Sequence, residues 1–337
     1  MSTDGELPAN LPLFLTDADV ASISDWPAAI QAIRAAYKNP ADDAGTPGRI
    51  FAQTPREWLR VMPSVPPSGQ LFGAKSIAGS FVDGLRVSYL ISLFDKDTAD
   101  LVALVDGNRV TGLRTAATTA VGASSIVPPR PLSVGVIGSG FEARSHLTAF
   151  SHVLEFADVR VFSPTAANRE AFAAEFDGAF GAPVRAVGSA REAAEGADLI
   201  LCAARSRDES PTLQAEWVGP DSAVVSIGST TPAQRELPAE LIARATTVVV
   251  DTRDEVVHGS GDMITARANG VDVDSLVVTL NAVLSGETAI DVERGIRIYK
   301  STGSGLQDIV VAEMLVDRAR AEGVGTVLPV GIVTSRK

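Results

Sequence analysis

A glycine-rich turn between two apolar segments constrains this chain more than any other stretch. The apolar residues 134–137 predict a short buried strand, and apolar residues at helical spacing in 141–150 predict a helix. Gly138 permits a tight turn, Gly140 lets a ligand approach the backbone, and the small Ala143 lets the helix pack on the strand. The turn therefore predicts that a dinucleotide binds with its pyrophosphate at the helix N-terminus, although glycines also close strands for steric reasons alone.

Further apolar runs follow this turn, each with the length of a strand. Near-continuous apolar runs are typical of parallel strands that are buried on both faces. They occur at residues 159–162, 197–202, 223–227 and 247–251. The pattern predicts a doubly wound α/β domain of the Rossmann type, and the alternative is an α/β domain that binds no nucleotide.

The overall composition excludes several classes of protein. The chain has 337 residues and a net charge of −12, which disfavours a nucleic-acid or anionic membrane surface. Its one cysteine, Cys202, lies in a predicted buried strand, and its three histidines lack the spacing of metal ligands. The scattered histidines lead us to expect no metal site. No stretch approaches the length of a membrane span and the first residues do not resemble a leader, so we expect a cytoplasmic protein.

The remainder of the chain predicts a second domain that is mainly antiparallel α+β. A capping stretch at residues 16–19 precedes a helix at 26–37, a longer helix covers 111–125, and the last helix, Gly305–Glu322, crosses back to this first domain. Strands are predicted at 49–53, 58–62, 71–77, 87–94 and 101–106, with Pro63, Pro66 and Pro67 as breaks. Prolines at 127–131 mark a boundary, so we predict domains at 1–129 and 130–304 and a returning helix in 305–337.

Several motifs outside the glycine turn occur together. They are Arg114-Thr-Ala-Ala117, Ser226-Ile-Gly228 with Arg235-Glu-Leu237, and Lys300-Ser-Thr-Gly303 with Gln307-Asp308. Together they resemble the ornithine cyclodeaminase and mu-crystallin family from about Thr16 to Gly325. The resemblance implies a Rossmann domain inserted in an N-terminal domain that builds a homodimer interface. It also implies a nicotinamide cofactor and a 2-amino or 2-imino acid as substrate.

By this resemblance three cationic residues form the catalytic site. Arg114 and Arg49 match carboxylate-binding arginines, and Lys75 matches the active-site lysine. Two arginines can bind a carboxylate bidentately, and a lysine buried beside them has a lowered pKa and can donate a proton. The alternative for each is a surface salt bridge, and Arg56 and Arg60 lie close to Arg49 in sequence.

Two departures from the family pattern concern the substrate. Thr230 stands where cyclodeaminases carry an aspartate, and because a hydroxyl cannot act as a carboxylate base, imine reduction is favoured over ornithine cyclodeamination. Arg86 stands where they place a threonine, and it either faces a second anionic group of the substrate or points to solvent. With Met62 and Gly303, these residues complete the predicted substrate site.

The choice of cofactor depends on the end of the second Rossmann strand. NAD sites usually carry an acidic residue there, and none is present at Ser163 or Thr165, so we predict NADP with NAD as the alternative. The predicted cofactor-binding residues are Thr115, Gly138, Ser139, Gly140, Phe141, Glu142, Ala143, Ser163, Thr165, Asn168, Arg169, Ser229 and Asp308.

These predictions combine into an NAD(P)-dependent oxidoreductase that reduces a ketimine or cyclic imine, as a homodimer. The alternatives within the same class are an amino-acid dehydrogenase, an N-substituted amino-acid synthase and a cyclodeaminase. An alternative of another class is a non-catalytic NADP-binding protein, as in the crystallin branch of the family.

Overall fold

The protein is described by a computed structural model in which residues 11–39, 43–206 and 208–335 are placed. The chain divides into two compact units. Unit 1 contains the chain up to Thr115 and again from Ser304 onward, and unit 2 is Ala116–Gly303. Unit 2 is therefore inserted in unit 1.

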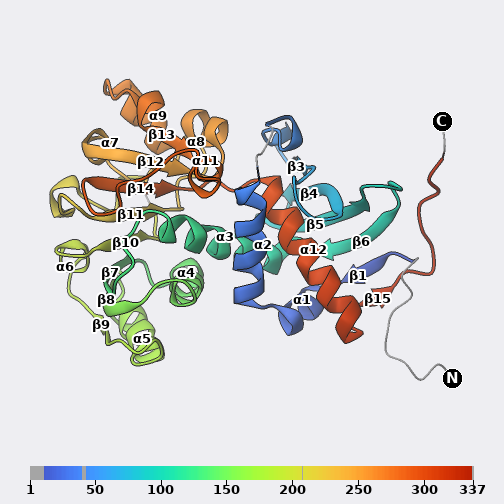
Figure 1. Ribbon diagram of the computed structural model, residues 1–337, viewed down its shortest axis with the longest axis horizontal. Coiled ribbons are helices and arrows are strands. Elements are labelled where there is room, and N and C mark those ends of the chain that lie inside the picture. The colour runs from blue at the N-terminus through green and yellow to red at the C-terminus, as the bar shows by residue number, and fades with distance from the viewer. Residues whose placement is uncertain (1–10, 40–42, 207, 336–337) are drawn as a thin grey trace. The chain divides into compact units, whose positions relative to one another are not determined.

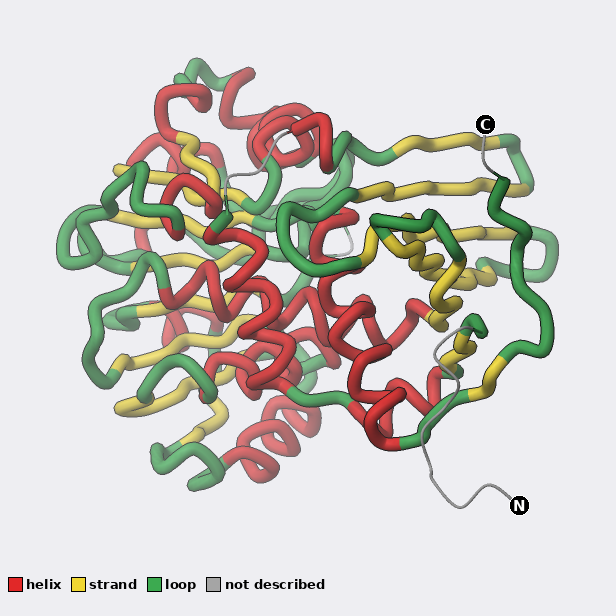
Figure 2. Tube along the Cα trace, turned by 45° about the vertical axis from the view of Figure 1, so that its right-hand side comes forward, coloured by secondary structure: helices red, strands yellow, loops and turns green. Residues whose placement is uncertain are grey.

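Unit 2 is built on an eight-stranded sheet in the order β13-β12-β14-β11-β10-β7-β8-β9, and all its paired strands are parallel. Figure 2 shows these strands with helices on both sides. The Rossmann-type α/β domain predicted from the sequence is confirmed. The strands are β7 (Leu132–Ile137), β8 (Phe156–Phe162), β9 (Val184–Ala186), β10 (Leu199–Cys202), β11 (Ala223–Ser226), β12 (Ala245–Val250), β13 (Val277–Thr279) and β14 (Ile296–Lys300).

Helices cover the sheet of unit 2 and bury its apolar residues. Cys202 lies in β10 and is fully buried, and burial raises the pKa of its thiol, so it packs in the core as predicted. The helices are α4 (Phe141–Ser151), α5 (Ala166–Phe176), α6 (Ala190–Ala194), α7 (Ala239–Arg244), α8 (Arg253–Gly259), α9 (Gly261–Ala268), α10 (Val273–Leu276) and α11 (Leu280–Leu284).

Unit 1 contains a seven-stranded sheet in the order β15-β1-β6-β5-β4-β3-β2. Its strands pair antiparallel except for β1 with β6, so the mainly antiparallel second domain is confirmed. The strands are β1 (Leu13–Leu15), β2 (Ile50–Gln53), β3 (Glu57–Ser64), β4 (Leu71–Ser80), β5 (Arg86–Asp95), β6 (Leu101–Asp106) and β15 (Thr326–Val327).

Several predicted element ends differ from the structure by a few residues, and two differences have a clear physical cause. Pro63 does not break β3, because the pairing of β2 with β3 stops at Val61 and proline is tolerated where no partner needs its N–H group. Helix α3 (Gly107–Ser124) begins before the predicted Thr111, because the carboxylate of Asp106 accepts a hydrogen bond from the N–H group of Asn108 at 3.0 Å.

The division between the units falls inside α3 rather than at the prolines near residue 130. A β-carbon on Gly122 would lie 2.2 Å from the ring of Tyr299, so the second half of α3 packs tightly within unit 2. The prolines end the helix, but they do not separate the units. The predicted roles of the two domains in binding substrate and in dimerisation stay predictions.

The helices of unit 1 are α1 (Asp17–Ile23), α2 (Trp26–Lys38), the first part of α3, and α12 (Gly305–Glu322). Thr16 and Asp19 form a capping box at α1, as the sequence predicts. Figure 1 shows α12 beside α2, and α12 also packs on β3, β4 and β5. The returning helix therefore covers part of the sheet of unit 1. In the described parts of the chain, no helix has the length and apolar character needed to cross a membrane.

Candidate active site

A buried cluster of charges lies in unit 1 where three elements meet. Lys75 in β4 donates a hydrogen bond from Nζ to Oδ1 of Asp308 in α12 at 2.7 Å. Arg114 in α3 donates from Nε to the same oxygen at 2.9 Å. Lys75 and Asp308 are fully buried and Arg114 nearly so. One carboxylate is thus shared between two cations that come from distant parts of the chain.

The electrostatic surroundings make Lys75 titrate near neutral pH. Burial lowers the pKa of Lys75 from 10.5 to about 7, the carboxylate of Asp308 opposes this effect, and the charges of Arg114 and Arg49 add to it. A lysine with this pKa can both hold and release a proton at neutral pH. The sequence prediction of a lowered pKa at this position agrees with the structure.

Arg114 is held by a second, neutral partner. Its Nη1 donates to Oε1 of Gln307 at 2.7 Å, and Nε2 of Gln307 donates to the hydroxyl of Tyr37 in α2 at 3.0 Å. Sequence reasoning assigned no role to Gln307 or Tyr37. Gln307 stands in a motif that was recognised, whereas nothing in the sequence connects Tyr37 with Arg114.

Asp308 has structural partners in unit 1, where its Oδ1 atom bonds Lys75 and Arg114. Its predicted role in binding the cofactor stays a prediction. Within the described chain its second oxygen, Oδ2, is buried and has no hydrogen-bond partner. A buried acceptor without a partner is costly, so this oxygen is suited to accept a hydrogen bond from a bound ligand.

The strand register places the other predicted substrate residues of unit 1. Met62 lies opposite Lys75 in the ladder and is buried. Arg49 precedes β2, is half-buried, and acts on the pKa of Lys75. Arg86 pairs with Ser80, an odd number of positions from Lys75, so it projects from the opposite face of the sheet, where it is exposed. In unit 1 Arg86 thus projects away from Lys75, and its role in binding the substrate stays a prediction.

The glycine turn of unit 2 has a backbone conformation that is suited to binding a pyrophosphate. Gly138 has φ +120°, and a β-carbon there would lie 2.6 Å from the carbonyl oxygen of Ala203. Gly140 is the N-cap of α4, contributes no side-chain cap, and has open space where a β-carbon would lie. Ala143 is fully buried. The free N–H groups at this helix N-terminus fit the phosphates of a dinucleotide.

Polar and cationic groups gather at the carboxyl end of β8. The hydroxyl of Ser139 donates to that of buried Ser163 at 2.8 Å. Arg169 donates to the carbonyl oxygen of Ser163 at 3.0 Å, and its guanidinium carbon lies 5.7 Å from the ring centroid of Phe162. Thr165 and Asn168 are exposed beside them. Among the described residues 163–169, which follow β8, no acidic side chain is present to bind a ribose hydroxyl and repel a 2′-phosphate.

The remaining predicted site residues lie in unit 2, apart from Thr115. Phe141 is exposed and Glu142 lies in the first turn of α4, whereas Thr115, which belongs to unit 1, donates to the carbonyl oxygen of Thr111. The hydroxyl of Ser229 bonds the carbonyl oxygen of Gln234 at 2.6 Å, and both the N–H group and the hydroxyl of Thr230 bond the side chain of Gln234. Gly303 donates its N–H group to the carboxylate of Asp251 at 2.8 Å.

A second buried network, which sequence reasoning missed, supports the loop after β11. Nζ of Lys300 lies 2.8 Å from the hydroxyl of Ser226 and 3.1 Å from Oδ2 of Asp262. Glu236 accepts hydrogen bonds from Ser226 at 2.6 Å and from the N–H group of Gly228 at 2.9 Å. Burial raises the pKa of Glu236 from 4.5 to about 7. Glu236 and Lys300 stand in recognised motifs, but Asp262 gives no signal in the sequence.

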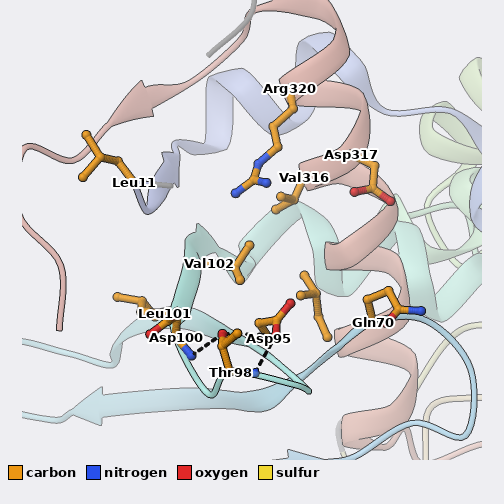
Figure 3. A pocket seen from close by; sticks show the side chains of 11 residues that line it. Leu11, Gln70, Asp95, Thr98, Asp100, Leu101, Val102, Val316, Asp317 and Arg320 are labelled. Carbon is orange, nitrogen blue, oxygen red and sulfur yellow. Dashed lines mark hydrogen bonds between the residues drawn. The ribbon is translucent and has the colours of Figure 1, made fainter. Parts of the chain in front are cut away.

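Unit 1 also contains a cavity of about 340 Å³ that is separate from the charge cluster. Figure 3 shows the side chain of Arg320 directed into it. Neither Lys75 nor Arg114 contributes to its wall. The cavity is lined by Leu11, Gln70, Leu71, Asp95, Thr98, Asp100, Leu101, Val102, Val316, Asp317 and Arg320.

Comparison with known proteins gives matches along most of the chain. A family model described as the ornithine cyclodeaminase/mu-crystallin family matches residues 11–323. The ketimine reductase mu-crystallin of Mus musculus is 32% identical over 227 residues, which cover 67% of this chain and 68% of the mouse protein.

Two solved structures share the fold over nearly the whole chain. The Delta(1)-pyrroline-2-carboxylate reductase of Thermococcus litoralis, in complex with NADH and L-proline, has a TM-score of 0.83 at 25% identity and covers 94% of this chain and 100% of its own. The iminosuccinate reductase of Paracoccus denitrificans, in complex with NAD⁺, has a TM-score of 0.84 at 26% identity and covers 95% and 100%. Each of these relatives is named as a reductase.

Proposed function

The chain belongs to the ornithine cyclodeaminase/mu-crystallin family and is an NAD(P)-dependent oxidoreductase acting on C–N bonds, and from that premise we propose that it reduces a small 2-imino acid to the 2-amino acid. The observation that carries the proposal is the sharing of the Asp308 carboxylate by Lys75 and Arg114. A buried arginine and a lysine that titrates near pH 7 are the groups that reduction of a carboxylated imine requires.

Each residue of the cluster has a separate role in the proposed reaction. Arg114 and Arg49 bind the substrate carboxylate and fix the position of the adjacent C=N carbon. Lys75 donates a proton from Nζ to the imine nitrogen, and Oδ2 of Asp308 accepts a hydrogen bond from that nitrogen once it is protonated. A nicotinamide cofactor, whose phosphates the N–H groups at the N-terminus of α4 would bind, would supply the hydride for this reduction. Hydride and proton together account for the two hydrogens that the C=N bond gains.

Within this function we propose NADP as the preferred cofactor. The support is the set of groups at the end of β8: Arg169 and the hydroxyls of Ser163 and Thr165 lie there, and the described residues 163–169 include no acidic side chain. A guanidinium and hydroxyls suit a 2′-phosphate better than a 2′-hydroxyl.

We further propose that the protein is a cytoplasmic homodimer. The sheet face opposite Lys75 carries apolar residues that are unusually exposed, including Ile50 at 62%, Leu59 at 43% and Leu90 at 41%. Contiguous exposed apolar residues of this kind support an interface between copies of the chain.

The test is NAD(P)H oxidation with a preformed cyclic imine and with 2-oxo acids mixed with ammonia or methylamine. Lys75→Met, which cannot donate a proton, should lower kcat about 10²–10⁴-fold, whereas the control Thr230→Val should cost less than about tenfold. A raised KM with kcat kept in Lys75→Met would limit Lys75 to binding the carboxylate. Tight NADPH binding without turnover of any imine would instead favour a non-catalytic binding protein.

A further inference from the structure

The cavity of unit 1 that lies apart from the charge cluster has no role in the proposed reaction. Its volume is about 340 Å³, and we call it the Arg320 cavity after the charged side chain directed into it (Figure 3). Aliphatic side chains form part of its wall, among them Leu71, Leu101, Val102 and Val316. A cavity of this size, with an apolar wall and a few charged groups, has the composition of a site for a small molecule.

Arg320 brings a guanidinium into this cavity from the last turn of α12. It is half-buried, and in the described part of the chain no carboxylate forms an ion pair with it. Asp317, three residues earlier, is close enough for charge to act between them: burial raises the pKa of Asp317, and the charge of Arg320 opposes that effect. A planar guanidinium binds a carboxylate through two parallel hydrogen bonds. Arg320 is therefore suited to hold the carboxylate of a ligand.

Three aspartates make the lining of the Arg320 cavity acidic overall. Asp95, Asp100 and Asp317 line it together with Arg320. Figure 3 shows Asp95 and Asp100 on the far side of the cavity from Arg320. Placing like charges together is costly, so this lining disfavours a phosphate or a dicarboxylate. It favours a ligand that carries an ammonium group beside its carboxylate.

The spacing of Arg320 and Asp317 distinguishes among ligands that carry both charges. Side chains three residues apart on a helix are neighbours, with about 5–6 Å between their β-carbons. A 2-amino acid has its carboxylate and its ammonium group on one carbon, so both groups can reach these two side chains. Its own side chain can then pack on the aliphatic wall. An amino acid with several carbons between the two charges has no such side chain to bury.

The Arg320 cavity is lined by the elements that position the charge cluster. Residues at the start of β4 line it, and Lys75 lies further along that strand. Residues at the start of β6 also line it, and β6 runs directly into α3, which carries Arg114. Helix α12 carries Asp308 as well as Arg320, which follows it by 12 residues, or about 18 Å of helix. A ligand in the cavity therefore contacts β4, β6 and α12 at once.

We propose that the Arg320 cavity is an effector site for a free aliphatic 2-amino acid, which binds with its carboxylate on Arg320, its ammonium group on Asp317 and its side chain against the aliphatic wall. Occupation of the cavity changes the rate of the reaction at the charge cluster through β4, β6 and α12. The effector role rests on the proposed function, whose product is itself a 2-amino acid, whereas the binding does not.

Calorimetric titration with L-valine and its analogues tests the chemistry of the site. Isovalerate lacks the ammonium group, isobutylamine lacks the carboxylate, and γ-aminobutyrate separates the two charges, so each should bind about 10–100-fold more weakly than L-valine. Arg320→Gln should weaken the binding of L-valine by a similar factor, and Arg320→Lys should restore part of it. Arg318→Gln is the matched control, because Arg318 also lies on α12 but pairs with Asp25 and Glu322 at 3.1 Å, and it should bind L-valine as the wild type does.

Thiol labelling locates the bound amino acid. Cys202 is the one cysteine of the chain, and it is fully buried with a raised pKa, so a thiol introduced on the cavity wall by Val102→Cys would be the reactive one. L-Valine at about ten times its Kd should slow alkylation of that thiol by iodoacetamide about tenfold, because only the empty cavity reacts. Adding Arg320→Gln should remove this protection at the same concentration. Alkylation that L-valine does not slow, or an affinity that Arg320→Gln does not change, would overturn the site.

The kinetics of imine reduction test the effector role. Saturating L-valine should change kcat/KM for the imine about fivefold or more in the wild type and in Arg318→Gln. Arg320→Gln should have the wild-type activity without L-valine and show no change with it. A competitive effect that is equal in all these proteins, or no effect at all, would overturn the effector role.

The two measurements separate this inference from the proposed function. If no imine is turned over but L-valine protects the thiol of Val102→Cys, the proposed function fails and the binding site stands. If imines are turned over but L-valine does not bind in the cavity, this inference fails alone.

Discussion

Replacing Asp308 by asparagine removes the negative charge that contacts Lys75 in the described part of the chain, while keeping the size of the side chain. The Nζ atom of Lys75 lies 2.7 Å from the carboxylate of Asp308, which raises the pKa of Lys75 against the larger lowering by burial. Opposite charges at this range shift a pKa by roughly 1–3 units. The pKa of Lys75, about 7 in the wild type, should therefore fall by that amount in Asp308→Asn.

The effect on activity follows from the proton that Lys75 must carry. A donor acts below its pKa, so kcat/KM should fall as the pH rises through about 7 in the wild type and at a lower pH in Asp308→Asn. At pH 7 the protonated fraction of Lys75 would drop roughly 5- to 500-fold, and activity should drop with it and recover on acidification.

The assay is a profile of kcat/KM for imine reduction between about pH 4.5 and pH 9. Gln307→Leu is the control, because it removes a neutral hydrogen-bond partner of Arg114 without changing any charge, and it should leave the alkaline limb of the profile in place. An Asp308→Asn profile that keeps the wild-type alkaline limb, or moves it to higher pH, would refute this account of Lys75.

Three further predictions concern the cofactor site, the substrate clamp and the buried network of unit 2. Ser163→Asp should lower the ratio of kcat/KM for NADPH to that for NADH about tenfold or more, and an unchanged ratio would place the 2′-phosphate elsewhere. Arg114→Ala should lower kcat/KM by about 2–4 kcal/mol in transition-state terms with cofactor affinity kept, and loss of cofactor binding instead would contradict its role in binding the carboxylate. Because the pKa of Glu236 is about 7 when folded and 4.5 ordinarily, its contribution to stability is complete below pH 4.5 and is lost as the pH rises through 7. Glu236→Gln should therefore gain stability relative to the wild type by up to about 3 kcal/mol between pH 4.5 and pH 8 in urea unfolding, and a constant difference would contradict the raised pKa.

Local patterns predicted the elements of the fold well because each depends on residues close in sequence. Neighbouring residues alone are enough to recognise the apolar runs of β7, β10 and β11 and the capping box of α1. Strand β14 was missed, although it is an interior strand of the sheet, between β11 and β12. Its sequence, IRIYK, contains two cationic residues. The burial of Lys300 depends on Asp262 and Ser226, and that of Arg297 on the carbonyl oxygen of Ile126, and only the tertiary fold brings these partners close.

The candidate site was predicted in part because the resemblance identifies residues but not their neighbours. Lys75 and Arg114 were identified, but the sharing of Asp308 between them depends on how α12 packs on the sheet. The orientation of Arg86 depends on strand register, since a shift of one residue reverses the face to which a side chain projects.

The insertion of unit 2 into unit 1 has a consequence for synthesis on the ribosome. Lys75 and Asp308 are separated by 233 residues, and at about 5–20 residues per second roughly 10–50 s pass between the synthesis of one and of the other. Throughout this interval all eight strands of unit 2 are made, while unit 1 lacks α12 and its many buried apolar residues. We therefore expect unit 2 to complete its folding first. During this interval the first half of unit 1 has an uncovered apolar sheet face, and the carboxylate that pairs with Lys75 and Arg114 has not yet been synthesised. We expect chaperones to bind the nascent chain at this stage.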